Sequence, residues 1–385
     1  MMSIVAKFAI QDTNFDFNVD LSADHFRVSS IPRPYTVEFV KSNQFAWLED
    51  KINSTHGALL LVDKNVKQNL FSHLKFRVPT YEVEAVEENK GIDTVLKICD
   101  WLLACNANRG SHLYVVGGGI IQDLGAFSGY MYKRGIPWTL VPTTLLSQAD
   151  SGLGGKTAVN YGQSKNVLGL FSAPRAVVND AEFTKTLSDK DFLSGGGEIL
   201  RLLVTGGEST FNLLESTVDD FVARIPTTVQ QLIAASLYIK RSIVEADEFE
   251  IDLRRSMNYG HSVGHAIEAL SNYAIPHGQA VALGIFVENM ISVNRGLLDQ
   301  ATANRIFDTG RKLISEDIWQ TFSNLEIDRL LPYLANDKKA EGTVLKLATI
   351  VRMGEMKFVN LELDQTGLDE IVRAVKGVVG VETTA

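Results

Sequence analysis

The chain has 385 residues, a formal net charge of −9, 45% apolar residues and 22% charged residues. This length predicts two domains, or three, with cores large enough to need no disulfide framework. The acidic balance argues against a nucleic-acid partner, because the phosphate backbone needs a basic footprint, but it allows a small anionic ligand to bind at a local basic cluster.

The two cysteines, Cys99 and Cys105, lie in an apolar run with helical spacing. We interpret them as core thiols in preference to redox or metal-binding groups. The sequence holds no apolar run of about 18 residues. Its first residues also lack the charged and apolar regions of a secretory signal, so we expect a cytoplasmic protein without a membrane partner.

Short apolar runs alternate with helical patterns in the first half of the chain. Residues 1–35 could form an extra pair of strands or a loose arm. Buried parallel strands are predicted at residues 58–63, 112–116 and 138–142, and a helix at 91–105. Strands that alternate with helices indicate a parallel sheet covered by helices.

Helical periodicity dominates the second half, at residues 210–245, 255–273, 278–297 and 300–316, before a β-branched run at 344–352. We therefore predict two domains. The first, residues 1–180, is a Rossmann-like α/β parallel-sheet domain with an N-terminal extension. The second, residues 181–385, is mainly α-helical.

A glycine-rich turn at residues 117–119, with Asp123 a few residues later, follows the strand ending at Val116 and precedes a predicted helix at residues 124–132. Such a turn lets the backbone approach a pyrophosphate, whose charge the helix N-terminus favours. A plain tight turn is the alternative. Asp63, at the end of an earlier strand, could bind a ribose hydroxyl or simply cap the following helix.

The polar stretch 142–166 contains paired threonines, an aspartate and Gly-Gly-Lys-Thr at 154–157. The spacing of its glycines does not match the Walker A pattern G-x-x-x-x-G-K-[ST]. Its backbone donors and ammonium groups still suit a phosphate. The stretch therefore predicts phosphate binding without hydrolysis of a nucleoside triphosphate.

Histidines and one carboxylate form a candidate metal site. His261 and His265 stand at i and i+4, on one face of a predicted helix, and His277 follows Pro276 at a loop-to-helix turn. Glu198, which follows three glycines and opens a helical run, is the best upstream carboxylate. Catalytic metals commonly use three such ligands and keep one position open. The alternatives are structural histidines and a glutamate that caps its helix.

Lys240 and Arg254 lie between these candidate ligands in the sequence, and Arg254 comes one turn before Asn258. Each cation alone would be interpreted as a solvated charge. Their crowding near the candidate ligands makes them candidate contacts for an anionic substrate.

In this order the segments resemble the sugar phosphate cyclase family, and within it the 3-dehydroquinate synthases. The resemblance covers most of the chain. The motifs that carry it are Gly117-Gly118-Gly119 with Asp123, Arg134-Gly135, Pro142-Thr143-Thr144-Leu145-Leu146, Gln148-Ala149-Asp150-Ser151 with Gly154-Gly155-Lys156-Thr157, Lys165-Asn166, Glu198, Lys240, Asn258 with Gly260-His261 and Gly264-His265, His277-Gly278 and Asp337-Lys338-Lys339.

The resemblance implies a role for each matching residue. A divalent metal, usually zinc with cobalt as an alternative, would be held by Glu198, His261 and His277. The NAD site would be lined by Asp63, Asn65, Glu87, Lys90, Gly118, Gly119, Asp123, Thr143, Thr144, Lys165, Phe183, Thr186 and Leu187. The hydroxyls and carboxylate of the substrate would contact Asp150, Lys156, Lys240 and Arg254. Its phosphate would contact Lys156, Asn166, Asn258, His265 and Lys339, with Arg134 supplied by the other subunit of a homodimer.

The similar enzymes use NAD transiently. NAD oxidises a secondary alcohol, the resulting ketone acidifies the adjacent C–H bond, and phosphate leaves by β-elimination. NADH then returns the hydride, and the opened ring closes by an intramolecular aldol step. A metal, lysines and arginines stabilise the developing charge. The implied reaction converts 3-deoxy-D-arabino-heptulosonate 7-phosphate into 3-dehydroquinate and phosphate.

Three features depart from the family pattern. Arg201 stands where related sequences carry a lysine three residues after the glutamate, so the resemblance makes it a candidate catalytic residue that contacts the substrate near the metal. A planar guanidinium does not replace an ammonium group directly. The three glycines at 195–197 indicate looser packing or a closer backbone approach. Val86 precedes Glu87 where a glycine is usual, and the chain carries an N-terminal extension.

Other functions stay open. Because Arg201 differs from the family pattern, the protein could instead be another cyclase of secondary metabolism, such as an aminodehydroquinate synthase or a heptulose or hexose phosphate cyclase. The retained Arg254, His265 and Asn258 favour the carboxylate-bearing substrate instead. A metal-dependent alcohol dehydrogenase of related fold would accumulate NADH. The retained ligand set argues against a non-catalytic sensor of NAD and sugar anions.

Overall fold

The computed structural model describes residues 3–41, 44–162, 164–335, 340–341 and 343–382. The chain folds into two compact units. The sheet unit comprises residues 23–187, and the helical unit comprises residues 1–22 and 188–385. The helical unit therefore includes the first 22 residues, which we expected in the N-terminal domain. Its second segment starts at residue 188, whereas we expected the boundary at residue 181.

The sheet unit is built on a seven-stranded sheet with the order β3-β4-β11-β8-β7-β5-β6. Its strands are β3 (His25–Val28), β4 (Tyr35–Val40), β5 (Ala58–Asp63), β6 (Thr80–Val83), β7 (His112–Gly117), β8 (Trp138–Pro142) and β11 (Ala176–Asp180). All neighbours are parallel except β3 and β4. The three predicted strands are present as β5, β7 and β8. β5 and β8 are buried along their whole length, as in a sheet covered on both faces.

The strand order reverses between β5 and β7. β5 leads to β6 on one side, whereas β7, β8 and β11 extend the sheet on the other. The helices that follow these two strands are α2 (Lys64–Leu70) after β5 and α4 (Gly119–Met131) after β7. In open α/β sheets, ligands bind at such a switch point, outside the carboxyl ends of the strands. The topology thus brings Asp63 and the glycine-rich turn to the same edge of the sheet.

The remaining elements of the sheet unit are α1 (Ala46–Ser54), η1 (Glu87–Asn89), α3 (Ile92–Ala104), η2 (Tyr132–Arg134), η3 (Ser147–Ser151), the hairpin of β9 (Lys156–Tyr161) and β10 (Ser164–Phe171), and η4 (Ala181–Thr186). The sequence predicts both ends of α3 to within one residue, whereas α4 begins at Gly119, five residues before its predicted start. Lys156 and Thr157 begin a strand, whereas the corresponding residues of a Walker A loop begin a helix.

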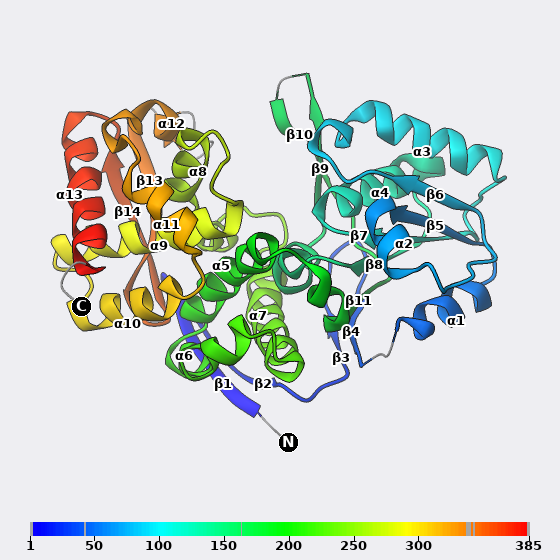
Figure 1. Cartoon of the computed structure of the whole chain (residues 1–385), viewed down its shortest axis with the longest axis horizontal. Coiled ribbons are helices and arrows are strands. Elements are labelled where there is room, and N and C mark those ends of the chain that lie inside the picture. The colour runs from blue at the N-terminus through cyan, green and yellow to red at the C-terminus, as the bar shows by residue number, and fades with distance from the viewer. Residues whose placement is uncertain (1–2, 42–43, 163, 336–339, 342, 383–385) are drawn as a thin grey trace. The chain divides into compact units, whose positions relative to one another are not determined.

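The helical unit contains a five-stranded sheet that joins the two ends of the chain, with the order β12-β13-β14-β1-β2. Its strands are β1 (Ser3–Ile10), β2 (Thr13–Asp20), β12 (Ala340–Glu341), β13 (Val344–Arg352) and β14 (Glu355–Glu362). β1 runs parallel to β14 through the pairs Ala9–Glu355 and Ile10–Met356. Figure 1 shows this pairing as blue β1 beside orange β14. The first residues are therefore a strand pair, not a loose arm.

Helices make up most of this unit, which confirms the predicted fold class. They are α5 (Asp189–Thr205), α6 (Glu208–Val222), α7 (Pro226–Ala246), η5 (Leu253–Asn258), α8 (His261–Leu270), α9 (His277–Asn294), α10 (Gln300–Arg311), α11 (Glu316–Ser323), η6 (Ile327–Arg329), α12 (Leu331–Ala335) and α13 (Gln365–Glu382). Residues 278–289 of α9 are all buried, so this helix is the centre of the unit. Within the described part of the chain, no helix is long and apolar enough to cross a membrane.

Glycines allow α5, α8 and α9 to pack with their backbones in contact. A Cβ atom added at Gly197 of α5 would lie 1.9 Å from the carbonyl oxygen of Gly278 in α9. A Cβ added at Gly284 of α9 would lie 2.0 Å from the carbonyl oxygen of Gly260, which precedes α8. The glycine-rich run at 195–197 therefore reflects a close approach of helices, the second of the two readings that the sequence allowed.

Candidate metal centre and nucleotide-binding edge

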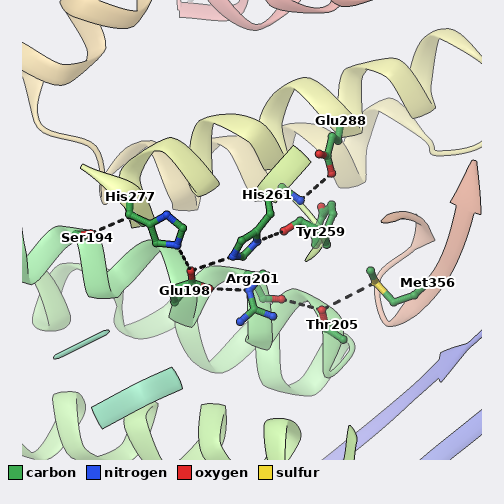
Figure 2. Close-up of polar contacts among 11 residues, drawn as sticks. Ser194, Glu198, Arg201, Thr205, Tyr259, His261, His277, Glu288 and Met356 are labelled. Carbon is green, nitrogen blue, oxygen red and sulfur yellow. Dashed lines mark hydrogen bonds and ion pairs between the residues drawn. The ribbon is translucent and has the colours of Figure 1, made fainter. Parts of the chain in front are cut away.

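Glu198, His261 and His277 converge in the helical unit from three different helices (Figure 2). The carboxylate oxygen Oε1 of Glu198 lies 3.3 Å from Nε2 of His261 and 3.2 Å from Nε2 of His277. The Glu198 side chain is almost completely buried, whereas His261 and His277 retain some solvent access. The sequence predicted these three residues as metal ligands, and the structure brings them together.

The spacing and chemistry of these atoms fit a divalent metal. With metal–ligand bonds of about 2.1 Å, the ligand atoms of a tetrahedral zinc site stand roughly 3.4 Å apart. The Glu198 oxygen and the two imidazole nitrogens are close to that separation. One carboxylate with two imidazoles is also a donor set of catalytic zinc, which keeps one coordination position for water or substrate.

Glu198 does not open its helix, as the sequence suggested. α5 begins at Asp189, capped by Ser188, so Glu198 lies in the middle of the helix. The glycines before it lie within the same helix. Because Gly197 has no side chain, α9 can approach α5 closely there. The alternative reading of Glu198 as a helix cap is therefore wrong.

Arg201 faces Glu198 from one turn further along α5. Its Nε donates to Oε2 of Glu198 at 2.7 Å, and its side chain is only 2% exposed. Burial alone would raise the pKa of Glu198, but the Arg201 guanidinium and the two imidazoles hold it well below its ordinary value. Glu198 is thus a carboxylate, with one oxygen directed to the histidines and the other to Arg201.

Each of the two candidate ligand histidines is oriented through its second ring nitrogen. His261 Nδ1 can donate to the carbonyl oxygen of Tyr259 at 3.3 Å, and His277 Nδ1 to the Glu268 carboxylate at 3.2 Å. Metal-bound histidines almost always donate their other N–H in this way, which fixes the tautomer and the ring. The sequence reading assigned neither partner. The spacing of Glu268 from His261 and His265, at i, i+4 and i+7 on one helix face, was the available signal.

The start of α8 is held by α9. Oε2 of Glu288 accepts a hydrogen bond from the backbone N–H of Gly260 at 2.7 Å, and the Tyr259 hydroxyl donates to Oδ1 of Asn289 at 2.6 Å. Glu288 and Asn289 are buried. Because His261 is the first residue of α8, these contacts fix its position relative to His277.

His265 belongs to the same cluster but is exposed. One nitrogen from each of His261, His265 and His277 lies within 4.8 Å of the others. Glu198 Oε1 lies 3.3 and 3.2 Å from the nitrogens of His261 and His277, which is close to the edge of a tetrahedral zinc site, roughly 3.4 Å, so this geometry supports Glu198 as the third ligand. The role of His265 at the phosphate stays a prediction.

The other predicted substrate residues of the helical unit lie on α7 and η5. Lys240 and Arg254 are buried. The Arg254 guanidinium donates to the carbonyl oxygen of Glu248, and its backbone N–H donates to Asp247 at 3.0 Å. Asn258 ends η5. Lys339 lies outside the described residues.

The carboxyl edge of the sheet carries many of the predicted NAD residues. Asp63 ends β5 and accepts a hydrogen bond from the backbone N–H of Asn65 at 2.9 Å, so it does cap α2. A Cβ added at Gly118 would lie 2.7 Å from Thr144, whereas one added at Gly119 would meet nothing within 4 Å. Open space therefore adjoins the first residue of α4, where a phosphate group is favoured.

A polar network joins four residues that were predicted to bind NAD or phosphate, and Asn160 connects one of them to the others. Lys90 Nζ lies 2.6 Å from Oδ2 of Asp123 and donates to Oδ1 of Asn166 at 2.6 Å. Asn160, which the sequence reading missed, donates to Glu87 at 2.8 Å and accepts from the backbone N–H of Asn166 at 2.8 Å. Burial raises the pKa of Asp123, and the Lys90 ammonium opposes that shift. The network ties the β9–β10 hairpin to α4.

The remaining predicted residues occupy the loops of the sheet unit. Asp150 lies in the π-helical turn η3, and the neighbouring Gln148 donates to the carbonyl oxygens of Pro142 and Asp180 at 3.0 and 2.9 Å. Gln148 belongs to a motif that carries the family resemblance, but the sequence predicted no role for it. Thr143 and Thr144 follow β8, Lys165 lies in β10, and Phe183, Thr186 and Leu187 lie in or just after η4.

Arg134 is exposed and follows Lys133, and both have positive φ angles, 64° and 50°. Two consecutive side-chain-bearing residues in the left-handed region are strained, and such strain persists where the surrounding structure enforces it. Lys156 is also exposed. The roles of Arg134 and Lys156 stay predictions.

Fold and metal centre together define a class of enzyme in which a doubly wound sheet accompanies a helical, metal-ligating unit. The chain matches the family described as 3-dehydroquinate synthase N-terminal over residues 80–194 and C-terminal over residues 195–340. It is 34% identical over 305 residues to the 3-dehydroquinate synthase of Dehalococcoides mccartyi, across 79% of this chain and 82% of that one. The chain belongs to the 3-dehydroquinate synthase family of sugar phosphate cyclases.

Two further similarities lie with other cyclases. The chain is 37% identical to a 2-epi-valiolone synthase of Actinosynnema mirum over 232 residues, which is 60% of this chain and 61% of that protein. A solved structure of ValA, a 2-epi-5-epi-valiolone synthase from Streptomyces hygroscopicus with NAD+ and Zn2+ bound, has a TM-score of 0.75. It is 24% identical and covers 92% of this chain and 99% of its own, and it confirms the fold.

Proposed function

We propose that this protein is a sugar phosphate cyclase that converts 3-deoxy-D-arabino-heptulosonate 7-phosphate into 3-dehydroquinate and phosphate. The observation that carries the proposal is the convergence of Glu198, His261 and His277, at 3.2 to 3.3 Å, in a chain of this family. A relative of that activity matches the chain over 79% of its length.

The proposed cofactors are NAD and a divalent metal, zinc or cobalt. When bound, the metal polarises a substrate oxygen and NAD reversibly accepts a hydride. The ligand spacing supports the metal, and the switch point with its open space at Gly119 supports the nucleotide. The solved ValA structure holds both groups. Asp63 is proposed to contact a ribose hydroxyl in addition to capping α2.

Buried cations support an anionic substrate. Arg254 and Lys240 are 2% and 4% exposed and stand where the family resemblance implies contacts with the substrate's carboxylate and hydroxyls. We propose that both contact the substrate, Arg254 at its carboxylate, together with Asp150 and Lys156. The proposed phosphate contacts are Asn166, Asn258, His265, Lys339 and, from a second subunit, Arg134.

The chain's own residues would then stabilise charge at each step. A C–H bond beside the transient ketone gives its proton to a base and its electron pair to a new C=C bond, and the electron pair of the breaking C–O bond leaves with phosphate. Lysine and arginine side chains offset the charge on the enolate and on the departing phosphate. The hydride returns to the carbon that lost it, and the aldol step forms a C–C bond. The net reaction loses phosphate and involves no oxidation.

A cyclase that acts on a heptulose phosphate without a carboxylate is the second candidate. The observation that favours it is Arg201, which is engaged with Glu198 where family members carry a lysine, together with the 37% identity to a 2-epi-valiolone synthase. Arg254 favours the first candidate. The two therefore differ in whether the substrate must carry a carboxylate.

Product analysis with two substrates tests the proposal. Purified protein with NAD and zinc is incubated with 3-deoxy-D-arabino-heptulosonate 7-phosphate or with sedoheptulose 7-phosphate, and phosphate, NADH and product mass are measured. We expect one phosphate and one 3-dehydroquinate per turnover, no net NADH, and much slower turnover of the second sugar. Faster turnover of sedoheptulose 7-phosphate would establish the second candidate, and accumulation of NADH would establish an alcohol dehydrogenase.

We also propose that the protein acts as a homodimer in the cytoplasm. The exposed Arg134 supports a contribution from a second subunit, since a cation held in a strained loop is available to a partner. Sedimentation at micromolar concentration tests the assembly. Mixing Arg134→Ala chains with chains that lack a metal ligand would restore part of the activity if the arginine acts across the interface.

A further inference from the structure

We infer that Glu268 positions His277 for metal binding, as the anionic partner in a carboxylate–histidine–metal arrangement. The inference rests on the proposed metal site and concerns a residue outside the predicted ligand set. Glu268 lies in the last turn of α8, whereas His277 is the first residue of α9. The turn between these helices brings Oε2 of Glu268 to 3.2 Å from Nδ1 of His277.

The His277 imidazole is held between two carboxylates. Its Nε2 faces Oε1 of Glu198 at 3.2 Å, and its Nδ1 faces Glu268. A metal bound between Glu198 and Nε2 would leave the single ring proton on Nδ1, where only an acceptor can stabilise it. Glu268 is that acceptor, so its carboxylate selects the tautomer that presents a free Nε2 lone pair to the metal.

Glu268 is more than a surface ion pair. Its side chain is 20% exposed and that of His277 is 35% exposed, so solvent screens their contact only in part. The two histidine ligands also differ in their partners, since His261 faces the neutral carbonyl of Tyr259. A carboxylate makes a stronger, charge-assisted hydrogen bond than a carbonyl does. His277 is therefore the ligand whose donor strength depends most on an outer partner.

The test measures metal affinity directly. Metal-free wild type, Glu268→Gln and Glu326→Gln are titrated with Zn2+ in competition with a chromogenic chelator, and Co2+ absorption spectra are recorded. Glutamine keeps the size of the side chain and removes its charge. Because partners of this kind contribute roughly 10- to 100-fold to metal affinity, we expect Glu268→Gln to bind Zn2+ at least tenfold more weakly and to shift the Co2+ bands.

Glu326→Gln is the matched control, since it also removes one carboxylate, from an exposed ion pair with Arg329. Its Zn2+ affinity should equal that of wild type. A Glu268→Gln protein that matches wild type in affinity and spectrum would overturn the inference and leave the metal site standing. A wild type that binds no metal would overturn both.

A double-mutant comparison separates positioning from general stability. If Glu268 acts through His277, adding Glu268→Gln to a metal-free His277→Ala chain should cause no further loss in the free energy of unfolding. An equal loss in both backgrounds would show that Glu268 supports the fold independently of His277 and would overturn the inference.

Discussion

Arg201 Nε donates to Oε2 of Glu198 across 2.7 Å, and this contact leaves Oε1 to the two histidine ligands. Both partners lie on α5, one turn apart, and both are almost completely buried. The arginine therefore holds the carboxylate of this proposed metal ligand in one orientation. Arg201 therefore orients Glu198 in this structure, whereas the family resemblance implied a contact with the substrate.

Replacing Arg201 with methionine should destabilise the metal-free protein and increase the effect of zinc. The substitution leaves a buried carboxylate without its permanent cation, which costs about 3 kcal/mol. Zinc would then supply the missing positive charge. Thermal unfolding with and without zinc should show a larger rise in midpoint for Arg201→Met than for wild type. Arg201→Lys keeps the charge, so its rise in midpoint with zinc should be smaller than that of Arg201→Met. Equal zinc effects in all three proteins would contradict the expectation.

His261→Ala should abolish metal binding and activity while the chain stays folded, since the ligand is not what holds its helix in place. α8 is anchored by the contact of Glu288 with Gly260 instead. Metal analysis and circular dichroism check both parts. His265→Ala is the matched control and should retain one metal per chain. Loss of metal from the control as well would point to a site formed by the three histidines.

Gly284→Ala should separate α8 from α9. The added methyl group would lie 2.0 Å from the carbonyl oxygen of Gly260, so the backbones must move apart. We expect a loss of about 3 kcal/mol in the free energy of unfolding, and weaker zinc binding because His261 and His277 move apart with their helices. Gly380→Ala, where a Cβ meets nothing within 4 Å, is the control and should be neutral or stabilising. Unchanged stability in Gly284→Ala would contradict the backbone contact.

His112 should make the protein less stable in mild acid. It begins β7, and burial together with nearby cations lowers its pKa from 6.5 to about 4. Between pH 6.5 and 4 the unfolded chain binds a proton that the folded chain does not, so the free energy of unfolding falls as the pH falls through this window. Denaturant unfolding at several pH values should show a shallower decline for His112→Gln than for wild type. Parallel declines would show that His112 does not contribute.

Asp63→Asn should separate the two roles of this residue. Asparagine caps helices as well as aspartate does, so the contact with the Asn65 N–H and the stability should remain. A hydrogen bond from ribose to a charged acceptor is worth about 1.5 to 3 kcal/mol, so NAD should bind roughly tenfold more weakly or worse. Calorimetric titration of NAD checks this. If Asp63→Asn binds NAD as wild type does while Asp63→Ala is merely less stable, Asp63 is only a cap.

Local patterns in the sequence predict several strands, one helix face and the glycine-rich turn. The buried strands β5, β7 and β8 follow from unbroken apolar runs, and the common helix face of His261 and His265 follows from a spacing of four residues. The glycine turn before α4 follows from its place between a strand and a helix. These features depend on residues within one or two turns of each other, so the sequence by itself determined them.

Contacts between distant segments needed the tertiary structure. The pairing of β1 with β14 moved the first residues into the helical unit, because strand pairing depends on partners that no local pattern identifies. The contact of His277 with Glu268 depends on the turn that joins α8 to α9. The meeting of Glu198 with His261 depends on helices brought together at Gly197 and Gly284. The sequence supplied the metal-binding groups, and only the packing of α5, α8 and α9 decided which atoms of those groups face one another.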